Sequence, residues 1–247
     1  MTNEEKFRFD LQGYLIIKDV LTADEVAEMN ELADKAFPSK DTDANIRSTS
    51  QVCLWGEPFK RLVDHPKIVP YLIELIGPKF RLDHDYCIFM TEGGGRGGLH
   101  GGDGIVGDHW YRYRDGIMRN GLSVVTYFLA DAAEGDGGFA CVPGSHKSHF
   151  LSCLPPDVRN FERIPDYVVQ PAVKAGDALF FTEELVHGTM PWRAKHERRA
   201  LLYKYSPGHS AWSGKYYNLE EFGELTEQQK RILIPPSIGG RPNVVQG

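Results

Sequence analysis

The sequence predicts a mainly β fold with flanking helices, in which many short strands form a sandwich or a barrel. From residue 80 onward, runs of β-branched and aromatic residues alternate with Gly, Pro and Asp, a pattern typical of such folds. With 247 residues, of which 41% are hydrophobic, the chain is long enough to bury a sizeable core. The helices are expected at the two ends of the chain.

The first forty residues predict a strand followed by a helix. Residues 13–18 (GYLIIK) are apolar and partly β-branched, as in strands. Thr22 and Glu25 have the spacing of a capping box, in which the hydroxyl and the carboxylate satisfy free backbone amides at a helix start. Apolar residues then recur at helical spacing until Pro38, where we expect the helix to end.

A second helix is expected over residues 66–76, before Gly77 and Pro78, and the strands follow it. Strand-forming runs occupy residues 80–90, 121–130, 137–142, 167–173, 177–182 and 198–205. We expect the strand that enters at Gly176 to continue to Gly188, so that His187 lies at its end. In the C-terminal tail, residues 219–233 predict an amphipathic helix.

Composition narrows the class of partner. The formal net charge is −6 and no stripe of Lys and Arg occurs, which argues against nucleic acid as a partner. No run of eighteen apolar residues occurs, and the N-terminus lacks the basic and apolar segments of a secretory signal, so we expect a cytoplasmic protein without a membrane partner. A small-molecule substrate is therefore the expected partner, and the sequence carries no signal for an oligomeric state.

Two of the nine histidines have a context that favours a functional role. His100 lies in a glycine loop (GGLHGGDG), where the backbone can approach a ligand closely. His187 is followed by Gly188, and Arg198 comes eleven residues after it. The remaining histidines, including His146 in a PGSH turn, are expected to be structural.

The order of these motifs resembles the phytanoyl-CoA dioxygenase-like branch of the Fe(II)/2-oxoglutarate oxygenases. The resemblance covers about residues 10–210 and rests on GYLIIKDVLTADEVAEMNELAD, GDGGFACVPGSHKSHF and GDALFFTEELVHGTMPWRAKHERRALLYKYSPG. It implies a double-stranded β-helix, a cupin-like jelly-roll barrel, formed by a single domain over 1–247 with a C-terminal extension over about 211–247. It also implies an enzyme that uses Fe(II), 2-oxoglutarate and O2.

By this resemblance, His100 and His187 are iron ligands. Two neutral imidazoles and a carboxylate on one face of the ion leave positions open for 2-oxoglutarate and O2. Arg198 is expected to bind the far carboxylate of 2-oxoglutarate, since a planar guanidinium matches a carboxylate in geometry. Thr189, on the same strand face as His187, is expected to add a hydroxyl to that contact.

The carboxylate expected two residues after the first histidine is missing, because Gly102 stands there. Asp103 is our first candidate for the third ligand, provided that a bulge turns it toward the metal. Asp108 is a second candidate and needs a larger excursion of the loop. Glu183 is a third candidate. It precedes His187 by four residues, which span about 13 Å along a straight strand, so the two side chains could bind one ion only if a turn lay between them.

Three functions remain open at this point. The first is hydroxylation-type oxidation of a C–H bond in a small molecule, with decarboxylation of 2-oxoglutarate to succinate. The second is halogenation, in which chloride binds iron in the space left by Gly102, as the resemblance to halogenases with the same departure implies. The third is a jelly-roll binding protein without activity.

Substrate recognition is expected in residues 108–120, where aromatic and basic side chains occur together. Arg112, Arg114 and Arg119 are the candidates for contact with an anionic or amphiphilic substrate. An exposed hairpin is the alternative interpretation of the same segment.

Overall fold

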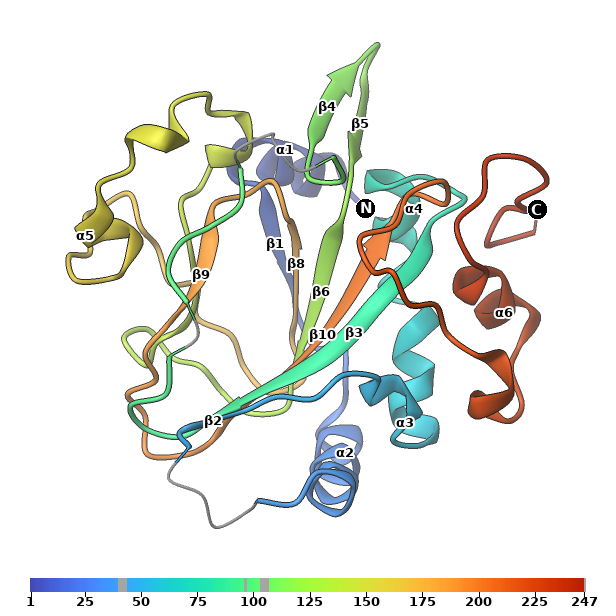
Figure 1. The fold of residues 1–247 in the computed structure, drawn as a ribbon, viewed down its shortest axis with the longest axis horizontal. Helices are drawn as coiled ribbons and strands as arrows, with labels where there is room; N and C mark the ends of the chain where they lie inside the picture. The colour runs from blue at the N-terminus through green and yellow to red at the C-terminus, as the bar shows by residue number, and fades with distance from the viewer. Residues whose placement is uncertain (40–43, 96, 103–106, 247) are drawn as a thin grey trace.

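A six-stranded antiparallel sheet organises the fold. The computed structural model describes residues 1–39, 44–95, 97–102 and 107–246. The strand order of the large sheet is β1-β8-β6-β10-β3-β2. Its strands are β1 (Tyr14–Ile17), β2 (Ile46–Arg47), β3 (Arg81–Met90), β6 (Ser123–Phe128), β8 (Ala178–Thr182) and β10 (Arg198–Ser206). A hairpin of β4 (Tyr111–Arg114) and β5 (Ile117–Asn120) projects beyond it (Figure 1).

A smaller antiparallel sheet faces the large one. It pairs β7 (Gly138–Cys141) with β9 (His187–Met190), and Figure 1 shows β9 across from β1, β8 and β6. Isolated bridges widen it on both sides, from His100 to His187 and from Cys141 to Val169. The two sheets enclose an apolar layer, which confirms the expected mainly β architecture.

Most helices lie on the outer side of the large sheet, whereas α5 packs against the small sheet through Val158. The helices are α1 (Asn3–Gln12), α2 (Ala23–Ala36), α3 (Glu57–Lys60), α4 (Val69–Leu75), α5 (Pro156–Arg159) and α6 (Glu227–Leu233). The N-terminus of α2 confirms the predicted capping box: the Glu25 amide donates to the Thr22 hydroxyl over 3.2 Å, and the Thr22 amide to the Glu25 carboxylate over 2.8 Å.

Side-chain alternation along β10 separates the two faces of the large sheet. Leu201, Tyr203 and Tyr205 are fully buried in the core beneath the helices. Ala200 and Leu202 point the other way, into the layer between the sheets. Because successive strand residues face opposite sides, residues 198 and 204 share the inner face with them.

The structure corrects three expected elements. Residues 167–173 form only isolated bridges, at Val169 and Val173. The expected helix over 219–233 is interrupted at Gly223, whose φ is +65°, and it is regular only in α6.

The expected strand from Gly176 to Gly188 is two strands. Strand β8 ends at Thr182, whose carbonyl accepts the Leu185 amide over 2.9 Å, and β9 begins at His187 after this turn. The turn therefore changes the direction of the chain just before the candidate ligand. Separately, none of the helices in the described ranges is long and apolar enough to cross a membrane.

Candidate active site

The layer between the two sheets contains a cavity of about 240 Å³. Its polar lining is His100, Glu183, His187, Thr189, Arg198 and Lys204. Its apolar and aromatic lining includes Tyr86, Ile88, Phe139, Phe181 and Leu202. The cavity therefore gathers the sequence-predicted residues His100, His187, Thr189 and Arg198 around one space.

His100 and His187 are held as a pair by their backbones. The His100 amide donates to the His187 carbonyl over 2.8 Å, the reverse bond measures 2.9 Å, and the ring centroids are 4.4 Å apart. Each ring also places Nδ1 against a backbone carbonyl, of Gly98 at 2.9 Å and of Leu185 at 2.7 Å. A carbonyl only accepts, so Nδ1 carries the proton and Nε2 keeps its lone pair for a metal ion.

His187 is neutral at pH 7. Burial lowers its pKa to about 4, although the neighbouring Glu183 carboxylate acts in the opposite direction. An imidazole binds a metal ion only in its neutral form. The environment of His187 therefore keeps it ready to act as a ligand.

Two glycines allow the His100 segment to lie directly against the turn before β9. A Cβ on Gly101 would lie 2.6 Å from the Glu183 carbonyl oxygen, and one on Gly102 would lie 2.7 Å from that of Glu184. Their φ angles, +91° and +68°, also favour glycine. At Gly102, the Leu151 Cδ1 atom lies 2.5 Å from the same Cβ position. The space that a side chain at Gly102 would occupy is therefore filled.

Glu183 places a buried carboxylate at the cavity. Its Oε1 lies 2.7 Å from Lys204 Nζ, and its Oε2 lies 3.8 Å from His187 Nε2 and 3.9 Å from His109 Nε2. Burial acts to raise the pKa of Glu183, but the charge of the Lys204 ammonium, and that of the His187 ring once it is protonated at low pH, outweigh burial and hold the pKa at about 2. The carboxylate is therefore ionised at neutral pH.

Arg198 is a buried cation that forms no salt bridge with a carboxylate of the described residues. Its side chain is 3% exposed, its Nε has no partner in the described part of the chain, and its Nη1 reaches only the Ile88 carbonyl at 3.4 Å and Met90 Sδ at 3.9 Å. Burial lowers its pKa to about 10, so it stays charged at pH 7. An unpaired buried charge is costly, and a carboxylate of 2-oxoglutarate would satisfy it.

Asp103 and Asp108 are the two candidates for a third metal ligand that follow His100 most closely in the sequence. Asp103 lies outside the described residues. Asp108 accepts hydrogen bonds from the hydroxyls of Ser206, at 2.7 Å, and Ser210, so it fixes its loop to the end of β10. No three His, Cys, Asp or Glu side chains of the described ranges already converge on a common point at which they would hold a metal ion.

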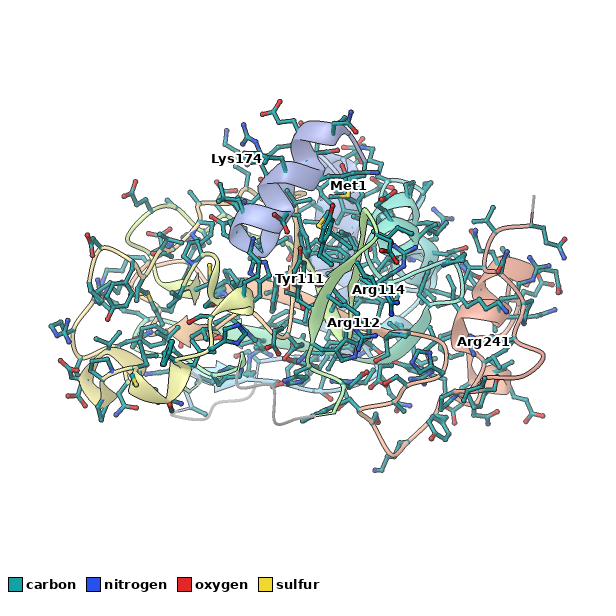
Figure 2. The ribbon with its side chains drawn as sticks, turned by 90° about the horizontal axis from the view of Figure 1, so that it is seen from above. Met1, Tyr111, Arg112, Arg114, Lys174 and Arg241 are labelled. Atoms are coloured by element: carbon teal, nitrogen blue, oxygen red, sulfur yellow. The ribbon has the colours of Figure 1, made fainter. Side chains whose placement is uncertain are left out.

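The candidate substrate arginines lie away from the cavity. Arg112 and Arg114 are exposed on β4, as Figure 2 shows, and Arg119 donates to the backbone carbonyls of Glu74 and Met118 over 2.7 Å each. None of the three lines the cavity around His100. The segment forms a hairpin of β4 and β5, and a role of the three arginines in substrate contact stays a prediction.

Three residues near the cavity were not predicted from the sequence. Strand alternation could have indicated Lys204, because it lies six residues after Arg198 and so shares the inward face of one strand. No pattern in the sequence indicates His109 or Trp212. Their rings stack with centroids 4.9 Å apart, and Trp212 lines a second cavity of about 390 Å³ together with His84 and Tyr216.

Comparison with known proteins identifies relatives of this architecture. Residues 9–200 match the family described as phytanoyl-CoA dioxygenase. The chain is 25% identical to the ectoine dioxygenase of Sphingopyxis alaskensis over 211 residues, which are 73% of this chain and 68% of that enzyme. It is 28% identical to the ectoine dioxygenase of Streptomyces coelicolor over 58% of this chain, and it spans half of that enzyme.

Solved structures share the fold. HygX from Streptomyces hygroscopicus, with nickel and 2-oxoglutarate bound, superposes with a TM-score of 0.76 at 20% identity, covering 91% of this chain and 95% of HygX. SnoN, a non-heme α-ketoglutarate-dependent epimerase from nogalamycin biosynthesis, superposes with a TM-score of 0.63 at 19% identity, covering 97% and 96% of the two chains. These likenesses confirm the expected jelly-roll barrel.

Proposed function

The chain belongs to the phytanoyl-CoA dioxygenase family, and from this premise we propose that it oxidises a C–H bond of a small molecule in a reaction that depends on Fe(II) and 2-oxoglutarate. Hydroxylation is the expected outcome, with 2-oxoglutarate decarboxylated to succinate. Bound Fe(II) supplies the redox chemistry by which O2 oxidises both 2-oxoglutarate and the substrate. The chain itself supplies the ligands, the binding groups and a cavity enclosed between two sheets.

The proposal rests on one observation: a pair of imidazoles and a buried guanidinium line the same cavity. His100 and His187 present their Nε2 atoms, since both Nδ1 atoms are bonded to backbone carbonyls. Arg198 is buried in the lining of the same cavity, where no carboxylate of residues 1–39, 44–95, 97–102 or 107–246 pairs with it, and Thr189 lines the cavity with it. A dicarboxylate that chelates a metal ion with one end and needs a cation at the other fits this arrangement.

We place the substrate beside this cavity, toward Trp212. The ring of Trp212, which lines the second cavity, stacks on His109, whose Nε2 lies 3.9 Å from the Glu183 carboxylate of the first cavity. In β3, His84 lies opposite Lys204 of β10 and also lines the second cavity. Ectoine and hygromycin B, the compounds named for relatives, are small polar molecules, and we propose a substrate of this class.

Halogenation is not favoured by the packing around Gly102. That hypothesis needs an open space for chloride where a carboxylate is missing, but the Glu184 carbonyl, Leu151 and Val186 fill the position of a side chain at Gly102. Gly102 also does not line the cavity that contains His100 and His187. We therefore propose oxidation without a halide cofactor.

Iron-dependent turnover of 2-oxoglutarate tests the proposal directly. The metal-free protein is supplied with Fe(II), ascorbate and 2-oxoglutarate in air, and succinate formation and O2 uptake are followed with ectoine and with hygromycin B as probes. We expect basal succinate formation that requires iron and is lost in His100→Ala and His187→Ala. His196→Ala is the matched control, because His196 is exposed and bonded to the Asp131 carbonyl. Succinate formation that is independent of iron and of both ligands would contradict the proposal.

A further inference from the structure

Glu183 is a buried carboxylate in the lining of the cavity, and the proposed reaction assigns it no role. We propose that Glu183, from the turn between β8 and β9, supplies the carboxylate of the iron site in place of the residue at position 102. This inference rests on the proposed function, because it completes the same site. It assigns the third ligand to a part of the chain that follows β8, not to the loop after His100.

The first support is the direction of the two carboxylate oxygens. Oε1 is held by Lys204 at 2.7 Å, whereas Oε2 is turned toward His187 Nε2 at 3.8 Å. Donors about 2.1 Å from one ion are about 3 to 4 Å apart, depending on the angle between them. The separation of Oε2 and His187 Nε2, 3.8 Å, lies at the wide end of this range, so a shared ion would draw the carboxylate a few tenths of an ångström toward the ring.

The second support is the turn that precedes β9. Along a straight strand Glu183 would lie about 13 Å from His187, out of reach. The hydrogen bond from the Leu185 amide to the Thr182 carbonyl closes a turn, which brings the Glu183 side chain back to the ring of His187. Gly101 packs against the Glu183 carbonyl in turn, so the three groups are fixed by one local arrangement.

The third support is the balance of charge. A buried Glu–Lys pair contributes little to stability, because the cost of desolvation offsets the attraction. Such a pair alone also gives no reason for Oε2 to face the Nε2 atom of His187. A divalent ion bound by His100 and His187 supplies that reason, with Lys204 acting as a positioning residue that orients the carboxylate.

Binding of Co(II) without oxygen tests the assignment. Affinity is measured by titration calorimetry, and the visible absorption of bound Co(II) reports its ligands independently of activity. We expect Glu183→Gln to weaken binding about 100-fold or more and to change the Co(II) spectrum. Glu184→Gln is the matched control, since it removes the same charge one residue away from a side chain that does not line the cavity. Asp103→Asn, measured in the same way, tests Asp103 as the alternative third ligand.

A second variant separates ligation from folding. Glu183→Gln leaves the Lys204 ammonium buried without its anion and so lowers stability. The double variant Glu183→Gln with Lys204→Met removes both charges, and we expect it to fold and still to bind Co(II) as weakly as Glu183→Gln. Lys204→Met alone keeps the carboxylate, and we expect it to retain Co(II) affinity within about tenfold of the unsubstituted protein.

The outcomes distinguish this inference from the proposed function. If the unsubstituted protein binds no Co(II), or binds it independently of His100 and His187, the proposed function fails. If those histidines are needed but Glu183→Gln binds as well as the unsubstituted protein, only the role of Glu183 is overturned. Loss of binding in Asp103→Asn with retention in Glu183→Gln would assign the ligand to Asp103, and equal losses in Lys204→Met and Glu183→Gln would make the pair structural.

Discussion

Gly138 and Arg198 pack so closely that no side chain fits between them. A Cβ on Gly138 would lie 2.8 Å from Arg198 Nε and 3.2 Å from its Cδ. Gly138 therefore leaves the space in which the guanidinium lies. This contact links β7, in the small sheet, to β10, in the large sheet, at the end of the cavity where we place the far carboxylate of 2-oxoglutarate.

The first prediction follows from this contact. Gly138→Ala is expected to displace Arg198 and to lower kcat/KM for 2-oxoglutarate by about 10- to 100-fold, the cost of a small misplacement of a binding group. Gly116→Ala is a matched control, because Gly116 has a similar φ, +79° against +81°, with no neighbouring atom within 4 Å. Steady-state kinetics of succinate formation measures both. Equal effects of the two substitutions would contradict a role through Arg198.

A second prediction concerns the charge of Arg198 itself. Arg198→Met is expected to weaken binding of 2-oxoglutarate by about 2–5 kcal/mol, because it removes one partner of a buried charge pair. Without cofactor, the same substitution is expected to raise the free energy of unfolding by about 1 kcal/mol, since an unpaired buried charge is removed. Titration calorimetry and denaturant unfolding measure the two effects.

Arg199→Met is the control for that experiment. Arg199 points to the opposite side of β10, where it bonds Asp34 at 2.6 Å and Glu197 at 2.8 Å. We expect its substitution to leave the affinity for 2-oxoglutarate unchanged. An Arg198→Met protein that binds 2-oxoglutarate normally would show that the cation serves another ligand.

A third prediction concerns Gly102. Gly102→Asp restores the expected His-x-Asp spacing, but its Cβ would meet the Glu184 carbonyl at 2.7 Å and Leu151 at 2.5 Å. We expect a loss of about 1–3 kcal/mol of unfolding free energy and no gain in metal affinity. Gly107→Asp, where no atom lies within 4 Å, is the control. Tighter Co(II) binding by the Gly102→Asp protein would contradict this packing argument.

A fourth prediction concerns the pH dependence of stability through His146, which is not a ligand. Burial lowers the pKa of His146 to about 4 from an ordinary value of 6.5. The unfolded chain therefore takes up a proton as the pH falls below 6.5, while the folded protein does so only near 4. Stability is full above pH 6.5 and falls between 6.5 and 4 by about 1.4 kcal/mol per pH unit for this group.

His146→Gln removes that dependence. Denaturant unfolding of the metal-free protein at several pH values is expected to give a smaller slope between pH 6.5 and 4 for this variant, with the contribution of His187 remaining. His196→Gln, at an exposed position, is expected to leave the slope unchanged. An unchanged slope in His146→Gln would show that His146 titrates normally in the folded protein.

Local signals predicted much of the fold. The capping box of Thr22 and Glu25 determines its own geometry within four residues, so α2 was predictable. The apolar runs of β3, β6, β8 and β10 were found because the strands that they form are buried. The continuous strand expected up to His187 was wrong. The turn before β9 is held by backbone bonds and by the hydroxyls of Thr182 and Ser145, and residues 183–185 contain no Gly or Pro that would have indicated it.

The site was only partly predictable for the same reason. His100, His187 and Arg198 belong to motifs that a resemblance can match. The partners of Glu183 come from three separate segments, at His109, His187 and Lys204, which only the closure of the barrel brings together. No spacing in the sequence encodes that convergence.

Anaerobic titration of the metal-free protein with Fe(II) and 2-oxoglutarate shows whether His100, His187 and Arg198 form one cofactor site. We expect a weak visible charge-transfer band that saturates at one equivalent of iron. We also expect that the band is absent in His187→Ala and requires much more 2-oxoglutarate in Arg198→Met. No band at saturating iron and 2-oxoglutarate in the folded, unsubstituted protein would mean that these residues do not bind the two cofactors together.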